Sequence, residues 1–202
     1  MTHTVWFVRH GESTANAGRW LAGHRDPPLT ATGRDQAMAL REPLRELRPA
    51  VVWSSDLQRA MQTAALAWDG PVTPVAALRE RSLGDLEGQA LAAVTAAGQR
   101  ASLRTWFPGP PGGESLRELA NRLLGWLAAH DRGTDAMLFC HAGPIRTLVG
   151  LLDGTPRDRI GLRKVGNTEV VARQIGPQTW AQLHASVAAE RTEDRDPGRR
   201  TP

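Results

Sequence analysis

Two apolar runs in this chain end directly in residues that can do chemistry. The first run, Val5 to Val8, is followed by a set of polar and permissive residues: Arg9, His10, Gly11, Glu12, Ser13 and Asn16. The second run, Ala136 to Cys140, is followed by His141. A guanidinium or an imidazole at the end of a buried strand costs desolvation free energy that core packing does not return. These residues therefore indicate a ligand site at the carboxyl ends of two strands, where open α/β sheets bind their ligands.

Further candidates bring more charge to the same sheet edge. Arg59 lies in the first turn after a third apolar run, Ala50 to Trp53. A helix that begins just behind His141 presents free N–H groups and the positive end of its dipole. Glu80 is a carboxylate in a charged loop that follows another short strand. Two imidazoles, two guanidiniums, the Asn16 amide and a helix N-terminus suit a tetrahedral dianion, because arginine binds phosphate oxygens through two parallel hydrogen bonds.

The elements that must position these residues follow from hydrophobic spacing and turn signals. The expected strands are residues 4–8, 50–53, 72–75 and 136–140, with a final strand pair at 169–175 and 179–184 around Gly176-Pro177. The first expected helix is 30–48, with Thr30 as its cap and a kink at Pro43, and the second follows a cap at Ser55 or Asp56. Further helices are expected at 89–104, at 115–130, where a capping box opens the helix, and at 145–152, where Pro144 fits the first helical position. This alternation predicts an α/β fold with three layers, α/β/α, around a mostly parallel central sheet.

The length and composition fit one domain. The chain has 202 residues, of which 41% are hydrophobic, and it contains no internal repeat and no long linker. We expect a single domain over residues 1–190, with residues 89–113 forming part of a cap over the site. The polar tail, residues 191–202, is expected to be disordered.

Several classes of protein are disfavoured by composition. The formal charge is only +4 and no block of five or six cations occurs, so a nucleic-acid partner is not expected. No apolar stretch reaches the roughly 18 residues of a membrane span, so no membrane partner is expected either. The single cysteine excludes an intrachain disulfide and a cysteine-based zinc cluster. The N-terminus runs straight into the first motif, leaving no room for a signal peptide. A cytoplasmic protein is expected, with a homodimer as one option for its oligomeric state.

Five segments, taken in order, resemble the histidine phosphatase superfamily, the phosphoglycerate-mutase-like group. They are RHGESTAN from Arg9, SSDLQRAMQTA from Ser54, LRERSLGDLEG from Leu78, PGGES from Pro111 and HAGPIR from His141. Three residues such as RHG recur by chance, but the combination with the downstream arginine, acidic loop and second histidine is specific. The resemblance spans about Val5 to Asn167 and implies a phosphoglycerate-mutase-like fold.

The same resemblance implies phosphoryl transfer to His10, which becomes phosphohistidine. Arg9, Arg59 and His141 would hold the phosphoryl oxygens. The physical chemistry agrees, because two nearby guanidiniums favour a neutral and therefore nucleophilic imidazole. They also spread the charge that builds on the equatorial oxygens in the transition state. Since the protein itself supplies this positive charge, no metal and no cofactor are expected.

Glu80 would protonate the leaving oxygen and then activate water, with Asp85 and Glu87 as rivals for that role. The remaining substrate-contacting candidates are Asn16, the Gly143 backbone, Ser13, Gly23, His24 and Arg81. A second acidic group on the substrate could be favoured by basic side chains outside the phosphate cradle, although exposure on helices explains them equally well. Those side chains are Arg25, Arg81, Arg100 and Arg104.

The choice between hydrolysis and mutation depends on departures from the mutase pattern. Leu83 stands where phosphoglycerate mutases carry a tyrosine, and the chain has no tyrosine. The segment from Gly88 to Gly112 is short and lacks an adjacent arginine pair. We therefore predict a metal-independent phosphatase acting on a small phosphomonoester, with phosphoglycerate mutase as the alternative. A non-catalytic phospho-ligand-binding module is a second alternative, and the complete set of reactive residues argues against it. A metallohydrolase lacks paired ligands at helical spacing.

Overall fold

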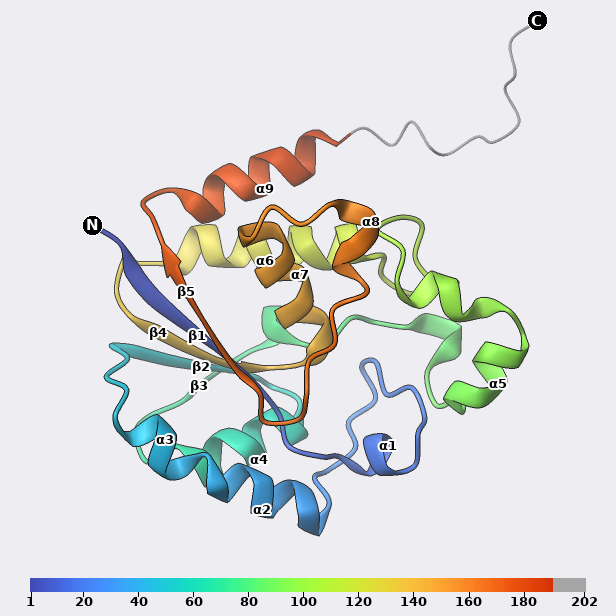
Figure 1. The fold of residues 1–202 in the computed structure, drawn as a ribbon, viewed down its shortest axis with the longest axis horizontal. Helices are drawn as coiled ribbons and strands as arrows, with labels where there is room; N and C mark the ends of the chain where they lie inside the picture. The colour runs from blue at the N-terminus through green and yellow to red at the C-terminus, as the bar shows by residue number, and fades with distance from the viewer. Residues whose placement is uncertain (191–202) are drawn as a thin grey trace, which may run out of the picture.

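The computed structural model describes residues 1–190, and its centre is one five-stranded sheet (Figure 1). The strands are β1 (His3–Arg9), β2 (Val51–Ser55), β3 (Thr73–Val75), β4 (Ala136–Cys140) and β5 (Val170–Ile175), in the spatial order β3-β2-β4-β1-β5. Every pairing is parallel except that of β5 with β1. The predicted α/β fold with a mostly parallel sheet is therefore confirmed. The predicted disordered tail lies outside the described residues.

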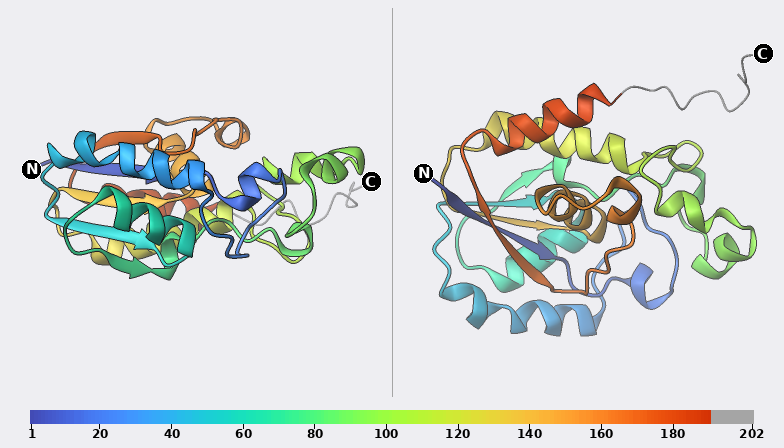
Figure 2. Two further views of the ribbon diagram at one scale, coloured as in Figure 1. Left: turned by 90° about the horizontal axis from the view of Figure 1, so that it is seen from below. Right: turned by 45° about the horizontal axis from the view of Figure 1, so that its top comes forward.

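Helices cover both faces of this sheet (Figure 2). In chain order they are α1 (Thr14–Ala17), α2 (Ala31–Ala39), α3 (Arg41–Arg45), α4 (Gln58–Ala67), α5 (Leu91–Ala96), α6 (Leu116–His130), α7 (Ala142–Leu152), α8 (Arg157–Ile160) and α9 (Thr179–Ala189). Short 3-10 turns are η1 (Ala76–Leu78), η2 (Gly84–Leu86) and η3 (Gln99–Leu103). Helices α3 and α4 pack on one face, and α6 and α7 pack on the other. None of the described helices is long and apolar enough to cross a membrane.

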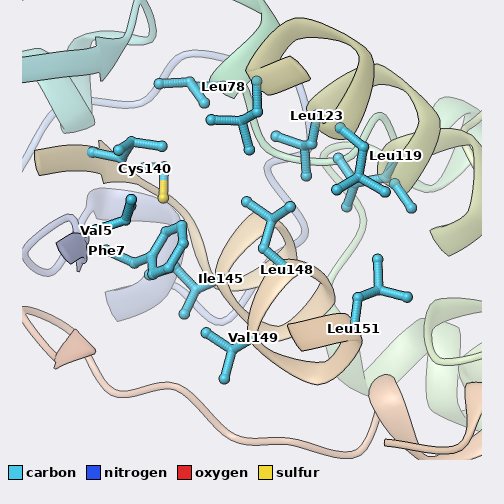
Figure 3. Packing of buried hydrophobic residues seen from close by; sticks show 14 of the residues in the cluster. Val5, Phe7, Leu78, Leu119, Leu123, Cys140, Ile145, Leu148, Val149 and Leu151 are labelled. Carbon is cyan, nitrogen blue, oxygen red and sulfur yellow. The ribbon is translucent and has the colours of Figure 1, made fainter. Parts of the chain in front are cut away.

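Alternation along the strands divides the core into these two layers. Val5 and Phe7 of β1 pack with Ile145 of α7 (Figure 3). Val8, on the opposite face of the same strand, packs with Met137 and with residues of α3 and α4. Strand β4 lies in the middle of the sheet, so all five of its residues are buried. This central position holds the end of β4 rigidly at the edge where His141 follows.

The expected strand at 179–184 is wrong, because this segment is part of helix α9. Strand β5 pairs with β1 and not with the residues that follow it. Trp180, Leu183 and Val187 recur at helical spacing and join the core on the α6 side of the sheet. Gly176-Pro177 therefore does lie in a turn after β5, but the element that follows this turn is a helix and not a strand.

The expected helix at 30–48 is broken into α2 and α3. Thr30 caps its start as predicted, but the break falls at Leu40 and not at Pro43. Pro43 has no N–H to donate to the carbonyl of Ala39, and its ring clashes with that carbonyl, so the helix ends one turn before the proline.

The expected helix at 89–104 is also broken, at Gly98, whose φ of +70° lies in the left-handed region between α5 and η3. The start of α4 is not capped by Ser55 or Asp56 as expected, since Leu57 is the N-cap and Asp56 pairs with Arg79. Helix α7 begins at Ala142, three residues earlier than predicted, so His141 is its N-cap residue. The capping box of α6 at Ser115 is confirmed.

Candidate active site

The register of β1 and β4 brings the two predicted histidines together. Arg9 pairs with Cys140 across the parallel ladder, so the next residues, His10 and His141, leave the sheet side by side. The His10 N–H donates to the carbonyl of Cys140 over 3.1 Å. The ring centroids of the two histidines lie 5.1 Å apart. Both side chains are buried, and residues 131 positions apart therefore share one site.

His10 is held with one particular nitrogen free. Its Nδ1 lies 2.6 Å from the carbonyl oxygen of Gly11, which can only accept a hydrogen bond, so Nδ1 carries the proton. The lone pair of the neutral ring is then on Nε2. Burial lowers the pKa of His10 well below its ordinary value, and the charges of Arg9 and Arg59 lower it further. The imidazole is thus neutral and nucleophilic at neutral pH.

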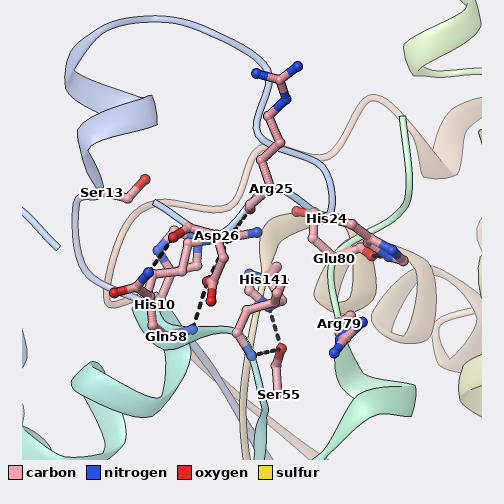
Figure 4. Close-up of polar contacts among 12 residues, drawn as sticks. His10, Ser13, His24, Arg25, Asp26, Ser55, Gln58, Arg79, Glu80 and His141 are labelled. Carbon is pink, nitrogen blue, oxygen red and sulfur yellow. Dashed lines mark hydrogen bonds and ion pairs between the residues drawn. The ribbon is translucent and has the colours of Figure 1, made fainter. Parts of the chain in front are cut away.

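His141 lies beside His10 (Figure 4) and is not among the residues that line the cavity described below. Its Nε2 lies 2.8 Å from the hydroxyl oxygen of Ser55, at the end of β2. Its Nδ1 is buried and has no hydrogen-bond partner among the described residues. Burial lowers the pKa of His141 well below its usual range, followed by the charge of Arg59.

The two arginines next to these rings are fixed by backbone carbonyls. Nη1 of Arg9 donates to Val165 O over 2.6 Å. Arg59, at the start of α4, is only 2% exposed and donates to Arg25 O and Gly23 O over 2.9 and 3.0 Å. Asp26 is the nearest acid, with its Oδ1 3.9 Å from Nη1 of Arg59. Both guanidiniums are therefore oriented in advance, and nearby acids, Glu80 first, compensate part of their positive charge.

Glu80 approaches the same centre from the segment after η1. Its Oε2 accepts from the backbone N–H of Gly143 over 3.1 Å, and its Oε1 accepts from the N–H of Arg81 over 2.8 Å. The two rivals for its role lie elsewhere. Glu87 accepts from backbone N–H groups, including that of His24, and Asp85 lies beside Gly112. Of the three acids, only Glu80 lines the cavity.

A clamp on the Glu80 segment is formed by Arg122 of α6. Its guanidinium donates to the carbonyls of Ala77, Arg79 and Glu80 over 2.8 to 3.2 Å. It also makes two 2.7 Å bonds to the carboxylate of Glu114. Burial raises the pKa of Glu114, but the hydrogen bonds and the charge of Arg122, together with the hydrogen bond from the Ser82 N–H, lower it below its ordinary value. The clamp fixes the backbone from which the Glu80 carboxylate extends.

A cavity of about 320 Å³ opens above His10 and is lined by residues from distant parts of the chain. Among the predicted residues, it is lined by Arg9, His10, Ser13, Asn16, Gly23, Arg59, Glu80, Arg81, Arg100, Arg104 and Gly143. Its apolar lining includes Leu83 and Leu91, and Leu91 belongs to α5. The size is at the lower end of small-molecule sites, which suits a small metabolite.

Asn16 and Ser13 form the capping box of α1 at the cavity wall. The Asn16 Oδ1 accepts from Ser13 and, over 3.3 Å, from the side-chain amide of Asn167. Since that oxygen is engaged, the Nδ2 of Asn16 is the group available to an anion. Asn167 also donates to the carbonyl of His10 over 3.1 Å and so links the two sides of the site.

Besides His141, two other predicted residues, His24 and Arg25, do not line the cavity. His24 instead places its Nε2 2.8 Å from the carbonyl oxygen of Glu80, so it contacts the backbone of the acid and not the cavity. The guanidinium of Arg25 is turned away from His10 and His141 (Figure 4). Both residues lie in the loop whose backbone carbonyls bind Arg59. Because this loop has no regular hydrophobic spacing, the sequence does not predict which way its side chains point.

Three residues that shape the site, Arg146, Arg122 and Asn167, were not predicted from the sequence. Arg146 lines the cavity one turn into α7, within the HAGPIR segment, and its helical position behind His141 was the available signal. Arg122 lies on α6 and Asn167 in the turn before β5, and no local sequence pattern marks either residue as part of the site. Among residues 1–190, no group of three histidine, cysteine or acidic side chains could hold a metal ion.

The fold and this site together define a three-layer α/β protein with two imidazoles and a set of arginines at the carboxyl edge of its sheet. The family model of the histidine phosphatase superfamily (branch 1) matches residues 5–187, and the chain therefore belongs to that superfamily.

Relatives within this superfamily carry two kinds of name. A glucosyl-3-phosphoglycerate phosphatase of Mycolicibacterium vanbaalenii is 35% identical, with 95% of this chain and 86% of the relative covered. A protein of Salmonella paratyphi C named "Probable phosphoglycerate mutase GpmB" is 37% identical, with 75% of each chain covered. Among solved structures, a mycobacterial glucosyl-3-phosphoglycerate phosphatase in complex with VO3 has a TM-score of 0.76 at 30% identity, covering 84% of this chain and 92% of the other.

Proposed function

We propose that this protein hydrolyses a small phosphomonoester through a phosphohistidine at His10, without a metal ion. The observation that supports the proposal is the free Nε2 of a buried His10, whose pKa is held well below its ordinary value by burial and by the charges of Arg9 and Arg59. An imidazole with its lone pair on that nitrogen attacks phosphorus, while the guanidiniums hold the phosphoryl oxygens.

In the first step, the His10 Nε2 forms a bond to phosphorus and the phosphorus–oxygen ester bond breaks. The protonated carboxyl of Glu80 gives its proton to the leaving oxygen, which departs as an alcohol. In the second step, the Glu80 carboxylate takes a proton from water as the water oxygen attacks phosphorus. The phosphorus–nitrogen bond breaks, its electron pair returns to Nε2, and inorganic phosphate is released.

Labelling tests this sequence directly. Incubation with a ³²P-labelled ester followed by rapid quenching is expected to leave acid-labile, base-stable label on the protein. His10→Ala should abolish both label and turnover, whereas His130→Ala, which removes an exposed imidazole at the end of α6, should retain both. Label that persists in His10→Ala contradicts the proposal. EDTA should leave the activity unchanged, and a loss restored by a divalent cation would exclude the metal-independent route.

Phosphoglycerate mutase is the second candidate, and one observation favours it. Arg100 and Arg104, which exposure on a helix would also have explained, both line the cavity. A mutase needs such extra cations to retain its phosphorylated product. Supplying 3-phosphoglycerate and measuring both released phosphate and 2-phosphoglycerate separates the two reactions. We expect phosphate release to dominate, because Leu83 lines the cavity at the position where phosphoglycerate mutases carry a tyrosine.

A further inference from the structure

The cavity contains far more positive charge than one phosphate needs. Of the described residues that line it, six are arginines and one, Glu80, is an acid. Arg9 and Arg59, whose charges act on His10, are the two that the proposed function assigns to the reacting phosphate. The four further arginines are Arg81, Arg100, Arg104 and Arg146. Within residues 1–190, none of these four forms an ion pair with a carboxylate, unlike the surface arginines at positions 41, 79, 157 and 173.

Arg81 and Arg146 are held in place by carbonyl groups. Arg81 is 4% exposed, its Nη2 donates to Leu103 O over 2.8 Å, and its Nη1 is buried without a partner among the described residues. Arg146 donates from Nε to Ala142 O over 3.0 Å and from Nη1 to Gly161 O over 3.3 Å. Carbonyls orient these guanidiniums but do not neutralise them, so both are fixed in advance with free charge and free donors.

The arginines also act on one another. Burial lowers the pKa of Arg81 to about 10, and the charge of Arg146 contributes to that lowering while Glu80 opposes it. Burial likewise lowers the pKa of Arg146, while the charge of Glu80 opposes this lowering and that of Arg104 adds to it. Like charges gathered in a partly desolvated cavity repel, and an anion placed among them relieves the repulsion.

We propose that this part of the cavity binds a second anionic group of the substrate, a carboxylate or a second phosphate, through Arg81 and Arg146. The inference rests on the proposed function, since it places the reacting phosphate at His10, Arg9 and Arg59. Arg100 and Arg104, in and just after the exposed turn η3, add attraction from the cavity rim. The preferred substrates are therefore phosphomonoesters whose alcohol portion is itself anionic.

Binding to His10→Ala, which cannot form a phosphoenzyme, tests this preference apart from turnover. Isothermal titration calorimetry compares 3-phosphoglycerate with glycerol 3-phosphate, which carries a hydroxymethyl group in place of the carboxylate. A second arm compares fructose 1,6-bisphosphate with fructose 6-phosphate. We expect the doubly anionic member of at least one pair to bind about tenfold or more tightly, as one charge-assisted contact provides. The pair with the larger ratio identifies the second group as carboxylate or phosphate. Ratios within about twofold in both pairs overturn the inference.

Variants locate the effect. Arg146→Gln in the same background is expected to reduce the larger ratio by about tenfold, and Arg104→Gln, an exposed change that spares packing, should reduce it by about threefold. Arg132→Gln removes one exposed positive charge in the α6–β4 loop and should leave the ratio unchanged. A ratio that survives both cavity variants, or falls equally in Arg132→Gln, overturns the assignment to these arginines.

The wild-type protein separates this inference from the proposed function. If p-nitrophenyl phosphate is hydrolysed through phospho-His10 but both affinity ratios stay within about twofold, only the proposed second anionic subsite is contradicted. If no phosphoenzyme forms but the ratios are high, the anion subsite stands and the hydrolytic mechanism fails.

Discussion

The carboxylate of Glu80 accepts a hydrogen bond from the backbone N–H of Gly143, with 3.1 Å between Oε2 and the nitrogen. This bond ties the proposed acid to the N-terminus of α7, directly behind His141. A Cβ atom on residue 143 would lie 2.0 Å from Oε1 of Glu80, so glycine is required for the approach.

Gly143→Ala is therefore expected to displace Glu80 and to lower kcat for alkyl phosphates by about 10- to 1000-fold, within the range of lost acid–base assistance. The helix should survive, because alanine favours helical backbone. Gly176→Ala, in the β5–α9 turn where a Cβ meets nothing closer than 3.4 Å, is the control for the substitution itself. Wild-type kcat in Gly143→Ala would contradict the role of this contact.

Glu80→Gln should separate substrates by leaving group. Glutamine keeps the shape but cannot donate an acidic proton, so kcat/KM for glycerol 3-phosphate, which reports phosphoryl transfer to His10, is expected to fall by about 100-fold or more. The kcat/KM for p-nitrophenyl phosphate should fall much less, because p-nitrophenolate leaves without protonation. Steady-state kinetics on both substrates measure the difference, and equal losses would point to another acid. Glu87→Gln is the matched control for the rival carboxylate.

Arg122→Gln should loosen the segment that carries Glu80. It removes the pairing with Glu114 and donors to three backbone carbonyls, so the free energy of unfolding is expected to fall by about 1–3 kcal/mol. Activity on alkyl phosphates should fall more than activity on p-nitrophenyl phosphate, as for Glu80→Gln. Urea denaturation of the single variants and of the double variant with Glu114→Gln gives the coupling energy. Strictly additive losses would contradict a shared clamp.

The buried histidines predict a specific dependence of stability on pH. Burial keeps the pKa of both His10 and His141 well below the ordinary value, whereas in the unfolded chain each imidazole binds a proton below about pH 6.5. The unfolded state thus holds more protons in this range, and the free energy of unfolding decreases as pH falls below about 6.5. Each histidine contributes a slope of up to about 1.4 kcal/mol per pH unit.

Removing one of the two buried histidines should therefore weaken the dependence of the free energy of unfolding on pH. His10→Gln is expected to lose stability less steeply than the wild type between pH 6 and pH 5, by about 1 kcal/mol per pH unit. Urea denaturation across this interval measures both slopes. His130→Gln removes an exposed imidazole and should keep the wild-type slope. An unchanged slope in His10→Gln would mean that His10 is protonated in the folded protein.

Sequence reasoning succeeded where an element could be recognised from its own residues. Strands β1 and β4 were visible as apolar runs, and the capping box at Ser115 marked the start of α6. It failed at residues 179–184, where the preceding turn signal was given more weight than the spacing of the apolar side chains. Residues 179–184 were assigned to a strand, although their apolar side chains have helical spacing and pack on α6 in the folded protein. The break at Leu40 followed from the chemistry of Pro43 but appeared one turn earlier than the proline.

The sequence by itself determined the chemistry that is available here, because residue types set it: an imidazole after a buried strand, guanidiniums nearby and a carboxylate in a charged loop. The tertiary structure decided which of these groups meet. The β1–β4 register places His10 against His141, and the contact with Gly143 selects Glu80 over Glu87 for the cavity wall. It also gathers Arg81 and Arg146 from separate segments around one cavity. Register and side-chain direction depend on packing between distant segments, and no local pattern in a single chain encodes them.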